Sequence, residues 1–255
     1  MKSFLLSSGT LWLREVVRFY RQPSRIMGAL ATPLMFWLLI GSGIGTSFRS
    51  EASGGGSYLL YFFPGALLMT LLFTAIFSTI SLIEDRREGF LQGVLIAPVP
   101  RSAFVMGKVL GGATLAFLQA AVFSLIAPLV GLHLGASALF LGVCVLFVNA
   151  FALTCLGFLI AWHFQSIQGF HAVMNLFLMP LWILSGSLFP EEGASGWLRP
   201  LMRLNPLRYG LESLQALAFG RPFSWGGFFM SSLFAASLFA LAVFFASRSS
   251  VRDAR

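Results

Sequence analysis

The sequence predicts an all-α integral membrane protein with six transmembrane helices, an N-terminal amphipathic surface helix and a re-entrant segment between the last two spans. Hydrophobic residues make up 57% of the 255 residues and charged residues only 10%, whereas a soluble domain carries about 25% charge. No Lys, Arg, Asp or Glu occurs from residue 109 through residue 190, a run long enough for three crossings. Crossings of about 20 residues leave no room for a separate soluble domain, so residues 1–255 form one transmembrane domain.

The first 25 residues predict a helix that lies on the cytoplasmic surface of the membrane. At about 100° per residue, Arg14, Arg18 and Arg21 share one face, and apolar residues occupy the other. Pro23 ends the helix. Attraction to anionic lipid and contact with a partner protein both remain open as its role.

Six apolar runs are long enough to cross a bilayer. Gly41 and Gly45 in the first run form a pair of small residues that can seat a neighbouring helix. A polar turn at residues 49–56 separates the first run from the second. The expected spans are residues 27–47, 58–83, 109–130, 138–162, 172–189 and 225–247.

The densest charge in the chain lies between the second and third spans, at residues 84–101. The first five residues are all charged, and we expect them to hold a loop in water. An apolar stretch follows, ends at Pro98 and Pro100, and offers a face on which another protein could dock. The residues assigned to this loop are Glu84, Asp85, Arg86, Arg87, Glu88, Gly89, Phe90, Leu91, Val94, Leu95 and Pro98, and the expected docking face is Phe90, Leu91, Val94 and Leu95.

A second polar segment, residues 190–221, lies between the fifth and sixth spans. Its short apolar patterns are interrupted by Pro200 and Pro206, so none of them can cross the bilayer. They fit interfacial or re-entrant helices, which membranes tolerate only where the backbone is buried in protein or faces water.

Basic residues are divided unequally between the two sides of the membrane. Twelve of the 17 Lys and Arg lie on the side of the two termini and of the loop after residue 84. The positive-inside rule therefore predicts that both termini and this loop are cytoplasmic. The net charge of +8 is explained by topology and lipid attraction, so we expect no nucleic-acid partner.

The spans lack the groups that an ion-coupled carrier usually keeps. None contains a charged residue, and Gln119, Asn149 and Asn175 are better explained by hydrogen bonds between helices. His163 and His171 could form a metal pair, but interfacial histidines are the favoured interpretation, and we expect no metal site.

No nucleotide-binding or hydrolase motif occurs in the chain. There is no Gly-x-x-x-x-Gly-Lys-Ser/Thr phosphate loop, no Gly-x-Ser-x-Gly and no His-Glu-x-x-His. If the protein uses ATP, another chain must bind it. Cys144 and Cys155 lie on one expected helix, too far apart to form a disulfide.

Two passages together point to a known family. EDRREGFLQGVLIAPVPR places a charged cluster and a glycine before an apolar stretch and an Ala-Pro pair. LMPLWILSGSLFP and the later LNPLRYGLESLQ supply a Ser-Gly step, a Pro and an Asn-Pro-Leu sequence, at Ser185, Gly186, Pro190, Asn205, Pro206, Leu207 and Tyr209. In these passages and in the order of its elements, the chain resembles the membrane subunit, or permease, of type-2 ATP-binding cassette exporters. That group includes bacterial drug, polysaccharide and lipo-oligosaccharide exporters.

The resemblance implies half of a transporter in the bacterial cytoplasmic (inner) membrane. Two permease copies, identical or related, would surround a central path, and two separate ATP-binding cassette ATPase subunits would dock beneath them. ATP and magnesium would be held by the ATPases, so this chain would carry no cofactor and no catalytic residue. Residues 84–98 would form a coupling helix and the helix of Arg14, Arg18 and Arg21 would brace it. The external gate would include Ser185, Gly186, Pro190, Asn205, Pro206 and Tyr209.

The cargo and two alternative functions remain open at this stage. Aromatic residues in the spans would suit an amphipathic or lipid-like substrate, such as a drug or a lipid-linked saccharide, but they would equally suit contact with lipid. A secondary carrier or channel would be expected to contain an intramembrane charge or an inverted repeat, and the sequence shows neither. A non-transporting assembly subunit fits the composition but does not explain the two matching passages.

Overall fold

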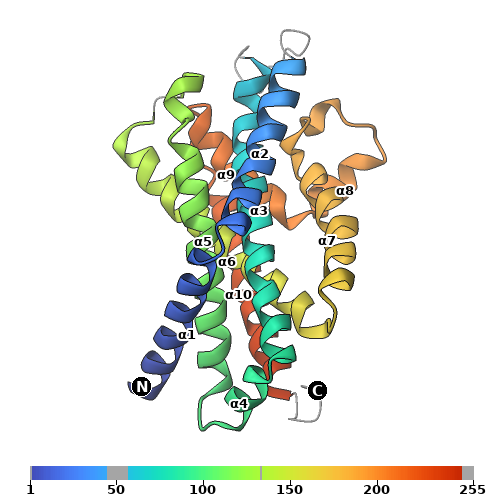
Figure 1. The fold of residues 1–255 in the computed structure, drawn as a ribbon. Helices are drawn as coiled ribbons and strands as arrows, with labels where there is room; N and C mark the ends of the chain where they lie inside the picture. The colour runs from blue at the N-terminus through green and yellow to red at the C-terminus, as the bar shows by residue number, and fades with distance from the viewer. Residues whose placement is uncertain (1, 45–56, 133, 249–255) are drawn as a thin grey trace.

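The computed structural model describes residues 2–44, 57–132 and 134–248, and within these residues the chain is a helical bundle without strands (Figure 1). Six of the described helices are long and apolar enough to cross a bilayer, namely α2, α3, α5, α6, α7 and α10, which confirms the predicted class. The elements are α1 (Lys2–Tyr20), α2 (Pro23–Ile44), α3 (Tyr58–Arg87), α4 (Phe90–Ile96), α5 (Arg101–Ser124), η3 (Ala127–Val130), α6 (Ala136–His163), α7 (Ile167–Trp182), η4 (Ile183–Ser187), η5 (Glu191–Gly193), α8 (Leu198–Leu204), α9 (Pro206–Ala218) and α10 (Trp225–Arg248).

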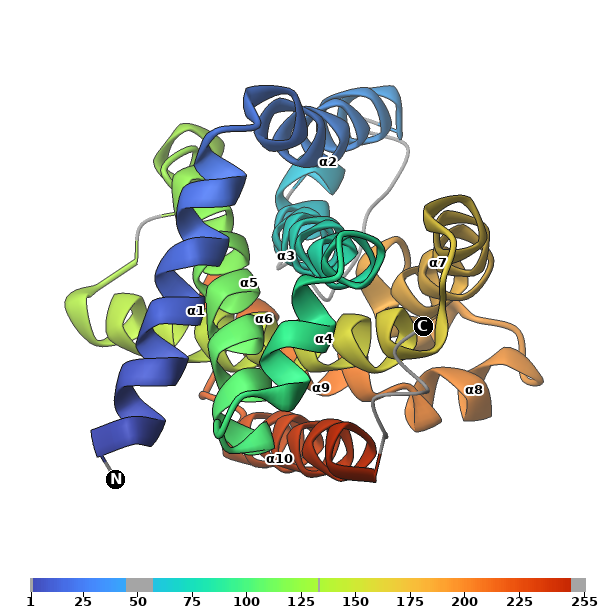
Figure 2. The same cartoon turned by 60° about the horizontal axis from the view of Figure 1, so that its bottom comes forward.

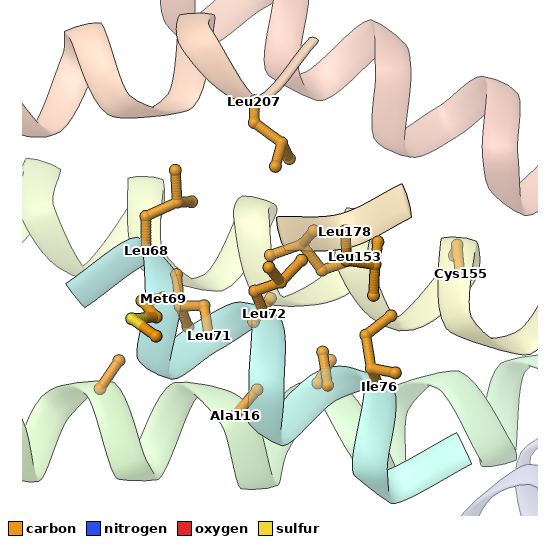
Figure 3. Packing of buried hydrophobic residues seen from close by; sticks show 14 of the residues in the cluster. Leu68, Met69, Leu71, Leu72, Ile76, Ala116, Leu153, Cys155, Leu178 and Leu207 are labelled. Atoms are coloured by element: carbon orange, nitrogen blue, oxygen red, sulfur yellow. The ribbon is translucent and has the colours of Figure 1, made fainter. Parts of the chain in front are cut away.

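Helix α3 is the axis of the bundle. In both views α5 lies on one side of it and α7 on the other (Figures 1 and 2). In its most apolar stretch 89% of the residues are buried, against 22% in α2, α7 and α10. In Figure 3 its Leu72 lies beside Leu153 of α6 and Leu178 of α7, and its Leu68 points toward Leu207 of α9. A helix that is apolar on all sides is expected at the centre of a bundle, since every face needs an apolar neighbour.

Helix α1 packs lengthwise on α5 instead of standing apart from the bundle. Its buried stripe follows helical spacing and consists of Ser8, Leu11, Glu15 and Phe19. Glycines on α5 allow the close approach: a Cβ at Gly107 would lie 2.7 Å from the Leu11 Cβ, and one at Gly111 would lie 2.6 Å from the Glu15 Cβ. The opposite face of α1 is apolar and exposed, so the expected contact with the membrane surface stays a prediction for that face.

Several helix ends differ from the expected span ends. Helix α3 continues through Arg87, and α5 already begins at Arg101, so the expected loop of residues 84–101 shrinks to α4 and two short links. Pro100 directly precedes α5, where a fixed φ is compatible with a helix start. The last residues of the expected first span and the polar turn at residues 49–56 lie outside the described residues.

The two ends of the bundle carry different elements. The α4 end carries α4, the start of α1 and the end of α10, and the α8 end carries η5, α8 and the start of α9 (Figure 1).

Candidate functional site

A buried group of charges joins α1, α3 and α5 at the α4 end, and we call Arg14, Glu15, Arg18, Asp85 and Lys108 the charged cluster. Asp85 is completely buried and accepts hydrogen bonds from Arg14 at 2.7 and 3.0 Å and from Arg18 at 2.8 Å. The Lys108 ammonium contacts the same carboxylate. Glu15 accepts from the Lys108 Nζ at 2.7 Å and from the Ser81 hydroxyl at 2.6 Å.

This arrangement satisfies the strict requirements of buried charge. An ion withdrawn from water costs several kcal/mol unless counter-charges and hydrogen bonds replace the water. Burial alone would lower the pKa of Arg14, but the hydrogen bond and the attraction to Asp85 raise its pKa above the ordinary value. Arg14 therefore stays cationic, and the cluster holds three helices together through fixed charges.

The charged run after the second span is therefore not the water-held loop that we expected. Glu84 and Arg86 are half-buried and Asp85 is fully buried, so only Arg87 and Glu88 are exposed as predicted. The reason is that Asp85 finds its partners on α1 and α5, which allows α3 to continue through the run as a helix. Arg14 and Arg18 contact Asp85 in this region, whereas Arg21 is exposed, and the bracing role of the three arginines stays a prediction.

Glu15 and Lys108 complete the cluster, and neither is among the residues predicted from the sequence. A signal for them was present. Lys108 is the last charge before the long uncharged run and directly precedes the expected third span, and a lysine at the edge of a span favours an acidic partner.

Helix α4 rests on this cluster and presents one short face outward. Gly89 links it to α3 with a φ of 76°, a left-handed conformation that favours glycine. Leu91 and Leu95 point inward and are buried, and the Arg14 guanidinium lies 3.8 Å from the centre of the half-buried Phe90 ring. The prediction that Leu91 and Leu95 form a docking face is therefore wrong, because the apolar side of α4 packs onto the chain itself. Its outward residues are Gly93, Ile96 and, just beyond, Pro98.

The end of α3 is also hydrogen-bonded to the end of α6 and to the link between α6 and α7. Arg86 donates to the carbonyl oxygens of Trp162 and Phe164, both at 2.7 Å, and Arg87 donates to that of Gln165 at 3.2 Å. The last carbonyls of a helix have no partner within it, so two arginines on a neighbouring helix provide a natural cap. A displacement of the α3 terminus would thus reach the start of α7.

At the α8 end, the predicted Ser-Gly step interrupts α7 by a π-helical turn. Gly186 has a φ of 95°, which glycine tolerates, and its carbonyl accepts from the Tyr61 hydroxyl at 2.8 Å. The Tyr58 hydroxyl donates to the Leu188 carbonyl, also at 2.8 Å, and the Trp182 indole donates to the Gly65 carbonyl at 2.9 Å. Ser185 is buried and its hydroxyl lies 2.7 Å from that of Ser187.

The Asn-Pro-Leu sequence forms the corner between α8 and α9 and fixes it to the end of α7. The Asn205 amide donates to the Leu181 carbonyl at 2.5 Å, and its oxygen caps α9 by accepting from the Leu207 N–H at 3.0 Å. Pro206 occupies the first position of α9, and the Tyr209 hydroxyl donates to the Arg203 carbonyl at 3.2 Å. Pro190 precedes η5, whose Glu191 carboxylate pairs with Arg203 and Arg208. The predicted outer residues thus belong to one folded segment, which comprises η4, η5, α8 and α9 (residues 183–218) and which we call the α8 segment.

Neither end of the molecule offers a metal centre among the described residues, in which no group of three His, Cys, Asp or Glu side chains comes together. His163 and His171 each lie edge-on to a phenylalanine, Phe245 and Phe77 respectively. Cys144 and Cys155 are free thiols.

The chain matches a known protein family over a range that includes both ends of the bundle. The family model described as ABC-2 type transporter matches residues 8–219, a range that includes the charged cluster, α4 and the α8 segment. The chain is 28% identical over 235 residues to a protein of Cyanophora paradoxa named as the transport permease ycf38, covering 89% of this chain and 78% of that one. Nodulation protein J of Rhizobium meliloti (strain 1021) is 24% identical over 245 residues, covering 95% of this chain and 91% of the relative. The daunorubicin resistance ABC transporter permease protein DrrB1 of Streptomyces coeruleorubidus is 23% identical over 223 residues, covering 84% and 75%. The chain therefore belongs to the ABC-2 type transporter family, and it is a membrane permease with six spans.

Proposed function

We propose that this permease is one half of the membrane part of an ATP-driven exporter, and that α4 is the element on which an ATP-binding cassette ATPase subunit docks. The observation that carries the proposal is the construction of α4. Its inner face is fixed to the charged cluster, and its outer face is small, apolar and turned away from the bundle. A partner that moves α4 would move α1, α3 and α5 with it as one body.

The contacts of Arg86 and Arg87 extend this coupling to the other side of α3. Because both arginines hold carbonyls in the α6–α7 link, force applied at α4 passes through the end of α3 to the start of α7. Helix α7 ends just before the break at Gly186. Tyr61 of α3 donates to the Gly186 carbonyl, and Asn205, which caps α9, donates to the Leu181 carbonyl near the end of α7. We infer that the α8 segment closes the outer end of the path and that movement of α7 opens it.

The proposed assembly contains two permease copies and two ATPase subunits. In α2, α7 and α10 only 22% of the most apolar stretch is buried within the chain, which leaves long apolar faces for a second copy or for lipid. We propose α2 and α7 as the dimer faces, with ATP and magnesium bound by the ATPase subunits. Native mass measurement of the purified complex should give two permeases and two ATPases, and one permease with two ATPases would contradict this arrangement.

The proposed location is the bacterial cytoplasmic membrane, with α4 and both termini in the cytoplasm. A cysteine at Gly93 tests the α4 end and a cysteine at Gly193 tests the α8 end, since both positions are exposed and an added Cβ meets nothing within 4 Å. An impermeant thiol reagent added to intact cells should label Gly193→Cys and not Gly93→Cys. The reverse labelling would invert the topology and remove the proposed docking role.

We propose an amphipathic or lipid-like cargo for this transporter. Two relatives are named for daunorubicin resistance and for nodulation, so the names do not point to one shared substrate. The spans supply aromatic and aliphatic surface with little charge, which suits a cargo with a substantial apolar part.

The decisive experiment places a charge on the outward face of α4. Ile96 is 71% exposed, so Ile96→Asp should insert and fold normally. If Ile96 is buried against the ATPase, the substitution costs about 1.5–3 kcal/mol of docking free energy and lowers the docked fraction about ten- to a hundredfold. The measurements are copurification of the ATPase and substrate-stimulated ATP hydrolysis in proteoliposomes.

The matched control is Leu204→Asp, which introduces the same charge at an exposed residue of α8, at the opposite end of the bundle. It should retain the ATPase. Wild-type docking and stimulation in Ile96→Asp would refute the assignment of this face. Phe90→Asp is less informative, because it places a carboxylate beside the Arg14 guanidinium.

A further inference from the structure

A cavity near the α8 end has no part in the proposed coupling. It has a volume of about 400 Å³ and lies between α3, the end of α5 with η3, the start of α6, and α9. Its walls include Phe63, Leu67, Leu125, Leu139, Val143 and Leu217. None of its described lining residues belongs to α2 or α7. The cavity is therefore separate from the proposed dimer faces.

The side chains that line the cavity favour an apolar ligand such as a hydrocarbon chain. Among the described residues, the lining contains one side chain with a polar group, Ser124, and its hydroxyl already donates to the Ala121 carbonyl at 2.7 Å. A water molecule needs two to four polar partners, and a polar ligand would lose its hydration without compensation. Phe63, Leu67, Leu139 and Val143 all belong to helices that are long and apolar enough to cross a bilayer, so the acyl chains of the membrane are the hydrocarbon available to this cavity.

A positive charge lies close in sequence to one wall. Arg221 follows α9, three residues after the lining residue Ala218, and its backbone N–H donates to the Ala216 carbonyl at 2.9 Å. Its side chain is exposed and its guanidinium carbon lies 5.7 Å from the centre of the Phe219 ring. A guanidinium at the end of an apolar wall matches a phospholipid, which has a phosphate at the end of an apolar chain.

We propose that this cavity binds one phospholipid of the bilayer, with an acyl chain between α3, α5, α6 and α9 and the phosphate beside Arg221. An acyl chain in the cavity would contact α9 and the spans together, so the lipid would join the α8 segment to the bundle. The site is independent of ATP-driven transport, since it uses no residue of the charged cluster, of α4 or of α7.

Substitution of Gly142 by a larger residue should fill the cavity. It lines the cavity in the first turns of α6, and an added Cβ would meet only the Leu217 Cδ1, at 3.8 Å. A leucine there should favour the helix and occupy the space of the acyl chain. The matched control is Gly226→Leu, which makes the same change at an exposed glycine of α10 with nothing within 4 Å.

The measurement is native mass spectrometry of the permease purified in mild detergent from membranes of known phospholipid composition. We expect wild type and Gly226→Leu to retain one phospholipid per chain, identified by its mass. Gly142→Leu should lower the retained fraction at least about tenfold, because excluding two methylene groups is sufficient for that effect. Equal retention in Gly142→Leu and wild type, or no retained phospholipid in wild type, would overturn the proposal.

Two further arms keep the test valid if Gly142→Leu fails to fold. A phospholipid with a photoreactive acyl chain, retained through purification of the wild type, should crosslink within residues 139–146, whereas labelling confined to α2, α7 or α10 would refute the site. Arg221→Gln should lower retention several-fold with the crosslinked position unchanged. Unaltered retention in that variant would remove the phosphate from the assignment and would refute a phospholipid site as stated.

Discussion

The two ends of the bundle are held together by different kinds of interaction. At the α4 end, charged side chains from α1, α3 and α5 pair around the buried Glu15, Asp85 and Lys108. At the α8 end, neutral side chains such as Tyr61, Trp182 and Asn205 donate to backbone carbonyls, and the ion pairs of Glu191 lie at the surface. The contrast indicates where the protein is rigid and where it can rearrange.

Each kind of interaction responds differently to movement. A buried charge that loses one partner leaves another charge uncompensated, so the charged cluster tends to move as a whole. A neutral hydrogen bond to a carbonyl contributes about 0.5–1.5 kcal/mol net and can be exchanged for another donor or for water. The α4 end therefore suits the transmission of force, and the α8 end suits opening and closing.

The largest expected effect comes from removing the centre of the charged cluster. Asp85→Ala leaves Arg14, Arg18 and Lys108 with Glu15 as the remaining acid of the cluster, and should lower the free energy of unfolding by about 3–5 kcal/mol. Denaturant titration in detergent measures this loss. A loss below about 1 kcal/mol would mean that the cluster is hydrated, and the contrast between the two ends would disappear.

An intermediate effect is expected where a cation holds neutral carbonyls. Arg86→Met removes two hydrogen bonds to the end of α6 and should cost about 1.5–3 kcal/mol, together with weaker stimulation of ATP hydrolysis by cargo. Arg87→Met is the control, because Arg87 is exposed and makes one longer bond. Equal losses of stability and coupling in the two variants would remove Arg86 from the proposed path to α7.

A smaller effect is expected at the neutral corner of the α8 end. Asn205→Ala removes the cap of α9 and the bond to the Leu181 carbonyl, which should lower the unfolding free energy by about 1–2 kcal/mol. Hydrogen exchange should speed up in α8 and the start of α9 and stay unchanged in α1 and α4. Asn175→Ala, on the exposed face of α7, should change neither quantity.

The smallest effect is expected at the surface pairs of Glu191. Burial alone would raise the pKa of Glu191, but Arg203 and Arg208 hold it below its ordinary value of 4.5. A depressed folded-state pKa stabilises the fold above the ordinary value, and this stabilisation is lost as pH falls through the folded-state pKa. Wild type should exceed Glu191→Gln in melting temperature at pH 7 in low salt, by an amount equivalent to at most about 1 kcal/mol. A difference that persists in acid would show that the carboxylate charge is not responsible.

Hydropathy alone predicted the six spans, because a long apolar run must be buried in lipid or protein wherever it lies. It could not predict where α3 ends. Glu84 to Arg87 read as a loop until Arg14 and Lys108 are known to be adjacent, and that adjacency depends on α1 packing against α5. The sequence also could not predict which face of α4 turns toward the bundle. Leu91 and Leu95 share a face by helical spacing, but the sequence does not say whether that face meets the chain or a partner.

The residues of the α8 segment were predicted from a resemblance, and the physical role of each became clear only from the backbone around it. Asn205 is followed by a proline, which suggests a helix start, but its bond to the Leu181 carbonyl joins residues 24 apart. Such a contact depends on the π-helical turn at the end of α7, which local sequence preference does not specify.

The wide spacing of the charged cluster along the chain also sets an order for biosynthesis. Glu15 and its Lys108 partner are separated by 93 residues, with α2 and α3 between them. The ribosome makes α1 long before α5. Glu15 therefore lacks its lysine partner, and α1 lacks its contact with Gly107 and Gly111, until the third span has emerged. A nascent chain that stops short of Lys108 therefore leaves Glu15 with its neighbour Arg14 but without the buried lysine. Completion of the third span is thus the step at which the N-terminal helix becomes part of the protein.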